Sequence, residues 1–238
     1  MKAKRRSAAF LIGLTLIAAI LVTGFGALGV WQVNRLAWKR DLIARVDARI
    51  HATPAPAPAH AKETDEYRRV FVTGRFLNGK VTLVRASTVR GAGYWVMTPL
   101  VTDRGHIFMI NRGFVPPEAK DVYGRPEGGV RLTGLLRLSE PDGTILREND
   151  PQTDRWYSRD VARIAIKRGL EPPVANYFID AEAAPASSPG ALPAGGLTVV
   201  RFPNNHLGYA ITWFVLAVMS AGAYMFVMRQ ELGARRTQ

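Results

Sequence analysis

The stretch VRFPNNHLGYAITWF, Val200 to Phe214, marks the point where a polar segment becomes a helix of membrane-spanning length. Pro203 favours an extended conformation in the residue before it, and the asparagines after it can cap a helix. From Leu207 to Met228 about 22 residues carry no formal charge, enough to cross a hydrocarbon core of roughly 30 Å. We therefore predict a spanning helix at 206–228, with His206 in its first turn near the water interface.

A titratable imidazole at the edge of a membrane-spanning helix is uncommon and therefore indicates a functional residue. His206 has Arg201 just before it, and Tyr209 and Trp213 lie one and two turns further along. The alternative is an interfacial histidine that only hydrogen-bonds water and lipid headgroups. Residue type alone leaves both interpretations open.

A second membrane-length segment, Ala8 to Val30, has about 23 uncharged residues. It follows the basic sequence MKAKRR, which predicts a cytoplasmic N-terminus. Signal peptides carry an apolar stretch of only about 7 to 15 residues, so this longer one, which runs into Trp31, predicts an uncleaved anchor. Arg229, Arg235 and Arg236 follow the other span and predict a cytoplasmic C-terminus as well.

The chain between the two spans has about 175 residues, and loops of that length cross a membrane largely regardless of their charge. One large outer domain held by two spans is therefore expected. The predicted order is a cytoplasmic N-terminus at 1–7, a transmembrane helix at 8–30, a helix continuing outside the membrane at 31–52, a Pro/Ala-rich linker at 53–66, a periplasmic β-rich domain at 67–205, a transmembrane helix at 206–228 and a cytoplasmic C-terminus at 229–238.

Composition limits the chemistry of the chain. There is no cysteine, so disulfides, thiol nucleophiles and thiolate metal sites are excluded. The formal net charge of +13 is spread along the chain without a recognition motif, so nucleic-acid binding is not expected. Attraction to the anionic headgroups of a lipid bilayer, or to an acidic partner, explains the excess better. The N-terminal cations directly precede the apolar span instead of forming an amphipathic presequence, which favours a bacterial plasma (inner) membrane.

The outer domain shows short strand patterns separated by turns. The predicted strands are 67–76, 80–87, 94–102, 106–113, 129–138, 155–158 and 176–181. Asn78-Gly79 predicts a hairpin between the first two strands, and Asp103 to Gly105 a second hairpin between the next two. Ser158 or Asp160 can cap a helix that ends near Arg168. We predict a membrane-anchored α+β fold, with two transmembrane helices flanking an outer antiparallel β-sheet or partial barrel and one or two short helices.

Motifs for catalysis are missing from the sequence. It contains no nucleophile elbow, phosphate-binding loop, zinc-protease motif or dinucleotide fingerprint. The four histidines are scattered, and two of them flank the Pro/Ala-rich linker. We therefore expect the protein not to be an enzyme.

Five stretches, taken together and in this order, resemble the Surfeit locus protein 1 family (Shy-like). They are GVWQVNRLAWKRDLI from Gly29, YRRVFVTGRF from Tyr67, GYWVMTPL from Gly93, INRGFVP from Ile110 and RFPNNHLGYAITWFVLA from Arg201. The resemblance implies an assembly factor for a haem–copper terminal oxidase of the respiratory chain, which assists haem a handling or insertion into the largest, catalytic subunit. That subunit is the implied partner, with haem a synthase as a second candidate. Whether the client is a cytochrome c oxidase or a quinol oxidase stays open.

The resemblance also assigns residues by position. The proposed haem ligand of the family corresponds to His206, and its WQxxR element to Trp31, Gln32 and Arg35. A neutral imidazole is a standard axial ligand of haem iron, and Arg35 or Arg201 can face the propionates. The sequence offers no obvious second axial ligand. A single labile ligand suits a cargo that must be released.

The aromatic residues nearby allow two interpretations. Trp31, Tyr209 and Trp213 can flank the macrocycle, but anchoring at the membrane interface accounts for them equally well. The alternative function is a membrane-anchored scaffold, in which the NRGF and GYWVMTPL strands stabilise an oxidase assembly intermediate without binding haem.

Overall fold

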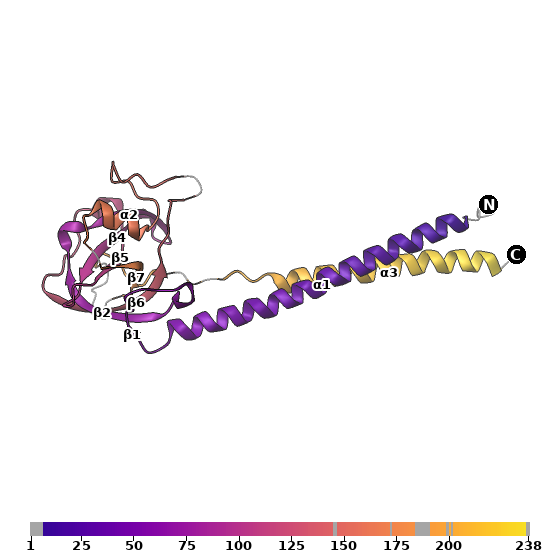
Figure 1. Ribbon diagram of the computed structural model, residues 1–238. Coiled ribbons are helices and arrows are strands. Elements are labelled where there is room, and N and C mark those ends of the chain that lie inside the picture. Colours follow the sequence, from indigo (N-terminus) through magenta and orange to yellow (C-terminus); the bar gives the residue numbers. More distant parts are fainter. Residues whose placement is uncertain are drawn as a thin grey trace. The chain divides into compact units, whose positions relative to one another are not determined.

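The computed structural model describes residues 7–144, 147–171, 173–183, 191–198, 200 and 202–236. The chain forms two units, which are coloured along the sequence in Figure 1. The helix pair comprises Met1–Arg45 and Arg201–Gln238, and the barrel unit comprises Val46–Val200.

The helix pair contains α1 (Ala8–Ile50) and α3 (His206–Arg236). Two polar contacts join them, from Thr15 to Tyr224 and from Gln32 to His206. The contact nearer the start of α1 is the one nearer the end of α3, so the two helices are antiparallel. The start of α1 and the end of α3 accordingly lie at the same end of the pair (Figure 1). The two contacts are about 17 residues apart along α1, or roughly 26 Å of helix.

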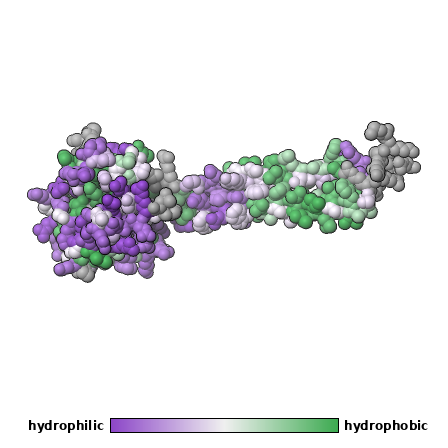
Figure 2. All heavy atoms as spheres, turned by 90° about the horizontal axis from the view of Figure 1, so that it is seen from above, coloured by the Kyte–Doolittle hydropathy of each residue, from purple (hydrophilic) through white to green (hydrophobic). Residues whose placement is uncertain are grey.

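Apolar side chains pack the helices together between the polar contacts. The rings of Phe25 and Trp213 stack with their centroids 5.7 Å apart. A Cβ atom on Gly29 would lie 2.6 Å from the ring of Phe214, so the absence of a side chain permits this close approach. Both helices have segments long and apolar enough to cross a membrane. The surface of these segments is hydrophobic, whereas the barrel unit is mostly hydrophilic outside (Figure 2).

The barrel unit is a seven-stranded sheet. Its strands are β1 (Ala55–Pro56), β2 (Arg69–Phe76), β3 (Thr82–Thr88), β4 (Gly91–Val101), β5 (Ile107–Val115), β6 (Gly129–Leu138) and β7 (Val174–Ala181). The strands β2, β6, β7, β5 and β4 close into a barrel, because β2 pairs with both β6 and β4. Gly74 permits the closure, since a Cβ atom there would lie 2.3 Å from the carbonyl oxygen of Val101.

The barrel is mixed, so the predicted antiparallel arrangement is only partly right. β7 runs parallel to β5 and antiparallel to β6. A parallel pair needs a long crossover connection, and here the chain between β5 and β7 supplies β6 and the helix α2 (Val161–Lys167). The described residues of the unit also form three short 3₁₀ helices, Glu63–Asp65, Asn78–Lys80 and Pro117–Ala119.

One predicted hairpin is confirmed and the other is wrong. β4 and β5 pair antiparallel across the loop at 103–105, as expected. However, β2 does not pair with β3, which pairs with β4 instead. The amide of Leu77 donates to the carbonyl of Pro99, and the Asn78 side chain donates to the carbonyl of Pro126. These contacts with distant strands and loops outweigh the local turn preference. The predicted strand at 155–158 forms only isolated bridges.

Buried side chains pack on both faces of the barrel wall. The inner cluster includes Val70, Leu100, Ile110, Leu136 and Ile179, one from each barrel strand. The outer cluster includes Met97, Met109 and Phe178, whose positions alternate with those of the inner residues, together with Trp156 and Ile164 of the covering segment. Helix α2 and the chain before it therefore cover the outer side of β3, β4, β5 and β7.

The Pro/Ala-rich segment is bound to the barrel rather than free. β1 pairs with β2 in parallel, and the hydroxyl of Tyr177 donates to the carbonyl of Pro58 over 2.7 Å. The side chain of Asn176 accepts from the amide of Ala61 and donates to its carbonyl. The Pro/Ala-rich segment thus follows a fixed path from β2 to β7.

The N-cap of α2 gives a testable prediction. The carboxylate of Asp160 is buried and accepts from the amide of Arg163 over 3.1 Å. Asp160→Ala is expected to lower the free energy of unfolding by about 1 kcal/mol, because it leaves that amide without its cap. Urea unfolding of the purified protein measures this. Asp142→Asn, which removes an exposed partner of the same arginine, is the control and should change stability by less than about 0.5 kcal/mol. Equal losses in the two variants would contradict the capping role.

Candidate functional site

The histidine selected from the sequence lies at the contact between the two helices. Nδ1 of His206, in the first turn of α3, is 2.8 Å from the amide oxygen Oε1 of Gln32 on α1. Gln32 is buried, with 9% of its surface exposed, and His206 is half-buried. The two residues are 174 positions apart in the chain, so only the antiparallel packing of the helices brings them together.

This contact determines the tautomer of the imidazole. An amide oxygen carries no proton, so a neutral His206 must donate through Nδ1–H, and its lone pair for a metal is then on Nε2. Nε2 has no hydrogen-bond partner among the described residues. A hydrogen bond to one ring nitrogen of a histidine also fixes the orientation of the imidazole ring. The hydrogen bond to Gln32 therefore leaves Nε2 as the nitrogen available to a ligand.

Exposed aromatic residues lie beside this pair on both helices. Trp31 is 53% exposed and Tyr209 is 56% exposed. Arg35 follows Trp31 by one turn, and its guanidinium lies over the ring of Trp38, 4.6 Å from the centroid. The cation is thus held by an aromatic face, and no carboxylate lies within ion-pair distance of it in the described part of the chain.

Two of the sequence-predicted residues are placed differently or not described. Trp213 stacks on Phe25 between the helices, so it contributes to helix packing. Arg201 lies outside the described residues. Phe202, which follows it, has the ammonium of Lys39 over its ring at 5.1 Å, so the segment entering α3 also contacts α1.

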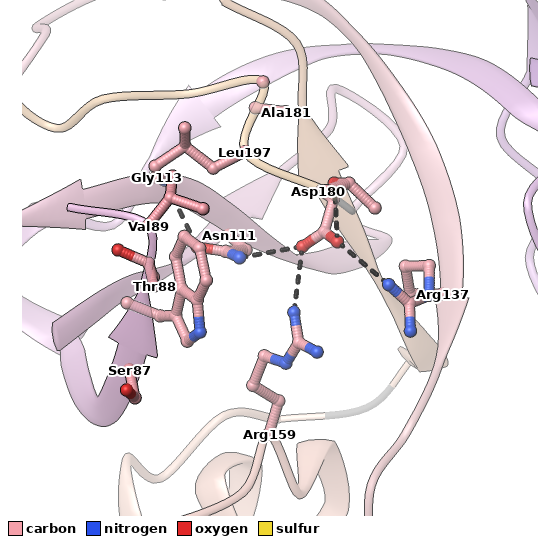
Figure 3. Close-up of a pocket in the computed structure, with 13 residues that line it drawn as sticks. Ser87, Thr88, Val89, Asn111, Gly113, Arg137, Arg159, Asp180, Ala181 and Leu197 are labelled. Atoms are coloured by element: carbon pink, nitrogen blue, oxygen red, sulfur yellow. Dashed lines mark hydrogen bonds and ion pairs between the residues drawn. The ribbon is translucent and has the colours of Figure 1, made fainter. Parts of the chain in front are cut away.

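The barrel unit has a separate polar site, which was not predicted from the sequence. A cavity of about 280 Å³ lies on the outer face of the barrel beside the ends of β5 and β7. In Figure 3 the side chains of Asn111, Arg137 and Arg159 converge on the carboxylate of Asp180. Asn111 donates to Oδ1 over 2.7 Å, and Thr198 donates to Oδ2 over 2.9 Å.

Two guanidinium groups flank the same carboxylate. Arg159 lies 3.3 Å from Oδ1 of Asp180, and Arg137 lies 3.4 Å from Oδ2. The side chain of Asp180 is only 4% exposed, so its charge depends on these partners. Each arginine has a second acid, Glu140 for Arg159 and Glu66 for Arg137. The network joins β5, β6, β7 and the segment that leads into α2.

Glu140 shows how the network responds to acid. Burial raises the pKa of Glu140, but the hydrogen bonds and charge of Arg159 outweigh it and hold the pKa below the ordinary value of 4.5. A carboxylate with a lowered pKa stabilises the fold fully above its unfolded-state pKa. That contribution is lost as the pH falls through the lower, folded-state pKa.

The sequence contains only weak signals for the residues of the polar site and for the partner of His206. Asn111 belongs to the INRGFVP stretch, and Asp180 is an acid at the end of the apolar strand β7. Gln32 lies beside Trp31 in the WQxxR element, but nothing local indicates that its partner is His206. These residues gain their roles from contacts between distant segments.

Fold and site together define a class of protein. It has two antiparallel helices of membrane-spanning length, a histidine held at their junction, and a mixed five-strand barrel inserted between them in sequence.

Comparison with known proteins identifies the family. The model of the SURF1 family matches residues 19–218. The SURF1-like protein of Monosiga brevicollis is 35% identical over 232 residues, covering 90% of this chain and 87% of that protein. Surfeit locus protein 1 of Homo sapiens is 38% identical over 228 residues, covering 85% and 73%. That of Rattus norvegicus is 37% identical over 225 residues, covering 85% and 71%. The chain belongs to the SURF1 family, as the sequence motifs indicated.

Proposed function

We propose that this protein is a membrane-anchored assembly factor for a haem–copper terminal oxidase and that it carries haem a to the largest oxidase subunit. It acts as a carrier and not as an enzyme. Membership of the SURF1 family supports the assembly role. The two helices of spanning length support anchoring in a bilayer, for which we propose a bacterial plasma membrane with both termini in the cytoplasm and the barrel unit in the periplasm.

The observation that carries the haem proposal is the hydrogen bond between His206 and Gln32. It leaves Nε2 as the metal-binding nitrogen and holds the ring in one orientation. Haem iron accepts such a neutral imidazole as an axial ligand. Because Gln32 is an uncharged acceptor, it orients the ring without adding a permanent charge at the membrane edge.

Residues around the ligand suit an amphipathic cargo. Trp31 and Tyr209 are exposed and can cover the apolar faces of a macrocycle. Arg35 presents a charged edge that can meet a propionate, with Arg201 as a second candidate. One protein ligand leaves the other axial position of the iron open. A single protein ligand therefore suits a cargo that must be released to a client.

The alternative function is a scaffold that stabilises an oxidase intermediate without haem. The observation in its favour is the barrel unit, whose outer surface is not needed to hold a cargo at the helix junction. On this view Gln32 and His206 serve only to fix the helix pair. The two functions differ in what co-purifies with the protein.

Expression in a host that makes haem a separates these functions. We expect the purified protein to show a Soret band, and extraction of the pigment to yield haem a. Purification from native membranes should also recover the largest oxidase subunit, with haem a synthase as a further candidate partner. Recovery of the oxidase subunit without haem would favour the scaffold. Recovery of neither would overturn the proposal.

A further inference from the structure

The outer face of the β3–β4 hairpin has a hollow that the proposed haem transfer does not use. Its volume is about 470 Å³. Its floor is made by Ala86, Ala92 and Gly93, in which Ala86 and Gly93 are cross-strand partners. Larger side chains, including those of Trp95 and Tyr157, line the sides of the hollow. The small side chains of Ala86 and Ala92 leave room for this hollow, whereas the position that a side chain on Gly93 would take is filled by the ring of Phe114.

Two arginines border the hollow and share one aromatic ring. The guanidinium of Arg85 lies 5.8 Å from the ring centroid of Tyr157, and that of Arg147 lies 5.4 Å from it. Both arginines are exposed, and neither has an ion-pair partner in the described part of the chain. A guanidinium stacked on an aromatic ring keeps its N–H edge available for a carboxylate.

A second hollow of about 380 Å³ adjoins the first and extends its positive charge. Arg85 and Tyr94, which face each other across the two strands, line both hollows. The second hollow adds four cations, namely Lys120, Arg125, Arg155 and Arg168. The second hollow has fewer carboxylates than cations, namely Asp121 and Asp154. Arg168 donates to both carboxylate oxygens of Asp154 over 2.7 Å.

We infer that these two hollows form a docking face for an acidic segment of a partner protein, with Arg85, Arg147 and Tyr157 at its centre. Three observations carry the inference. The face is concave, the two arginines at its centre have no carboxylate partner among the described residues, and it is rich in tyrosine, tryptophan and arginine, the residues that dominate protein–protein hot spots. Bidentate binding by arginine favours carboxylates, so aspartate or glutamate side chains of an extended segment fit between the two arginines. This role is separate from the proposed haem handling.

A peptide-binding experiment on the full chain tests the docking face. The protein is placed in nanodiscs of zwitterionic lipid and titrated with a fluorescein-labelled decapeptide of glutamate, and with a glutamine decapeptide for comparison. We expect tighter binding of the glutamate peptide, and weaker binding at high salt because exposed charges are screened. R85Q/R147Q should weaken glutamate-peptide binding roughly tenfold or more, since arginines at the centre of an interface are typical hot spots.

Two further variants separate docking from general attraction. R75Q/R104Q removes the same charge from exposed arginines that line neither hollow and should change the affinity less than about twofold. Ala92→Phe fills the floor without changing the charge and should weaken binding as strongly as R85Q/R147Q.

Three results would overturn the inference. They are equal losses in the two double variants, unchanged binding in Ala92→Phe, and binding of vesicles of anionic phospholipid through Arg85 and Arg147 with no binding of the glutamate peptide. Haem content of R85Q/R147Q should equal that of the unmodified protein. This last measurement distinguishes a failure of the docking inference from a failure of the haem proposal.

Discussion

Asp180→Ala is expected to lower the free energy of unfolding by about 3 kcal/mol or more, which is a large part of the stability of a typical domain. The carboxylate is almost fully buried and is shared by two guanidinium groups, Arg137 and Arg159. Removing it leaves both cations partly buried with one acid each, and leaves the donors of Asn111 and Thr198 without an acceptor. Unpaired buried donors are costly because they have already lost their water.

Urea unfolding in detergent, followed by tryptophan fluorescence, measures this loss. Glu182→Ala is the matched control, because Glu182 forms a short ion pair with Arg69 in a much more exposed place. Its loss should cost less than about 1 kcal/mol. Asp180→Asn keeps the shape of the side chain and should fall between the two. If Asp180→Ala were no more destabilising than Glu182→Ala, the network would not stabilise the barrel.

The sequence predicts those features of this fold that depend on neighbouring residues. The lengths of the uncharged runs locate both long helices, and strand β6 (Gly129–Leu138) has the predicted bounds because apolar and polar residues alternate along most of it. Of the two predicted N-cap residues, Ser158 and Asp160, the structure has Asp160, and such a cap depends on a side chain and an amide only three residues away. In each case the determining interactions lie within a few residues.

Features that depend on distant contacts could not be predicted. Asn78-Gly79 has the composition of a hairpin turn, yet bonds from β4 and from the loop before β6 decide the path of the chain there. The parallel pairing of β5 with β7 has no local signal at all. The contact between Gln32 and His206 could not be predicted either, because it exists only when α3 packs against α1. The sequence singled out His206 through its place at the start of a spanning helix and through the family resemblance, but it did not indicate that Gln32 is its hydrogen-bond partner.

The hydrogen bond that orients His206 leads to a graded prediction for haem binding. His206→Ala should abolish haem a retention, because it removes the axial ligand. Gln32→Leu should weaken haem affinity roughly 10–100-fold, since removing the partner of a ligating histidine typically costs that much. Without the acceptor, the imidazole can rotate and adopt either tautomer, so Nε2 is no longer the only metal-binding nitrogen. Titration of the cargo-free protein with haem, followed at the Soret band, measures both effects.

Matched variants distinguish orientation of the ligand from simple helix association. Tyr224→Phe removes a second polar contact between the described parts of the two helices, which joins Tyr224 to Thr15 over 2.9 Å and does not involve the histidine. It should leave haem affinity unchanged. Gln32→Glu keeps a hydrogen-bond acceptor opposite Nδ1 and should retain most of the affinity that Gln32→Leu loses. If Gln32→Leu bound haem as tightly as the unmodified protein, the hydrogen bond would serve only helix packing. If Tyr224→Phe lost as much affinity as Gln32→Leu, haem binding would depend on the general stability of the helix pair instead of on the orientation of one imidazole.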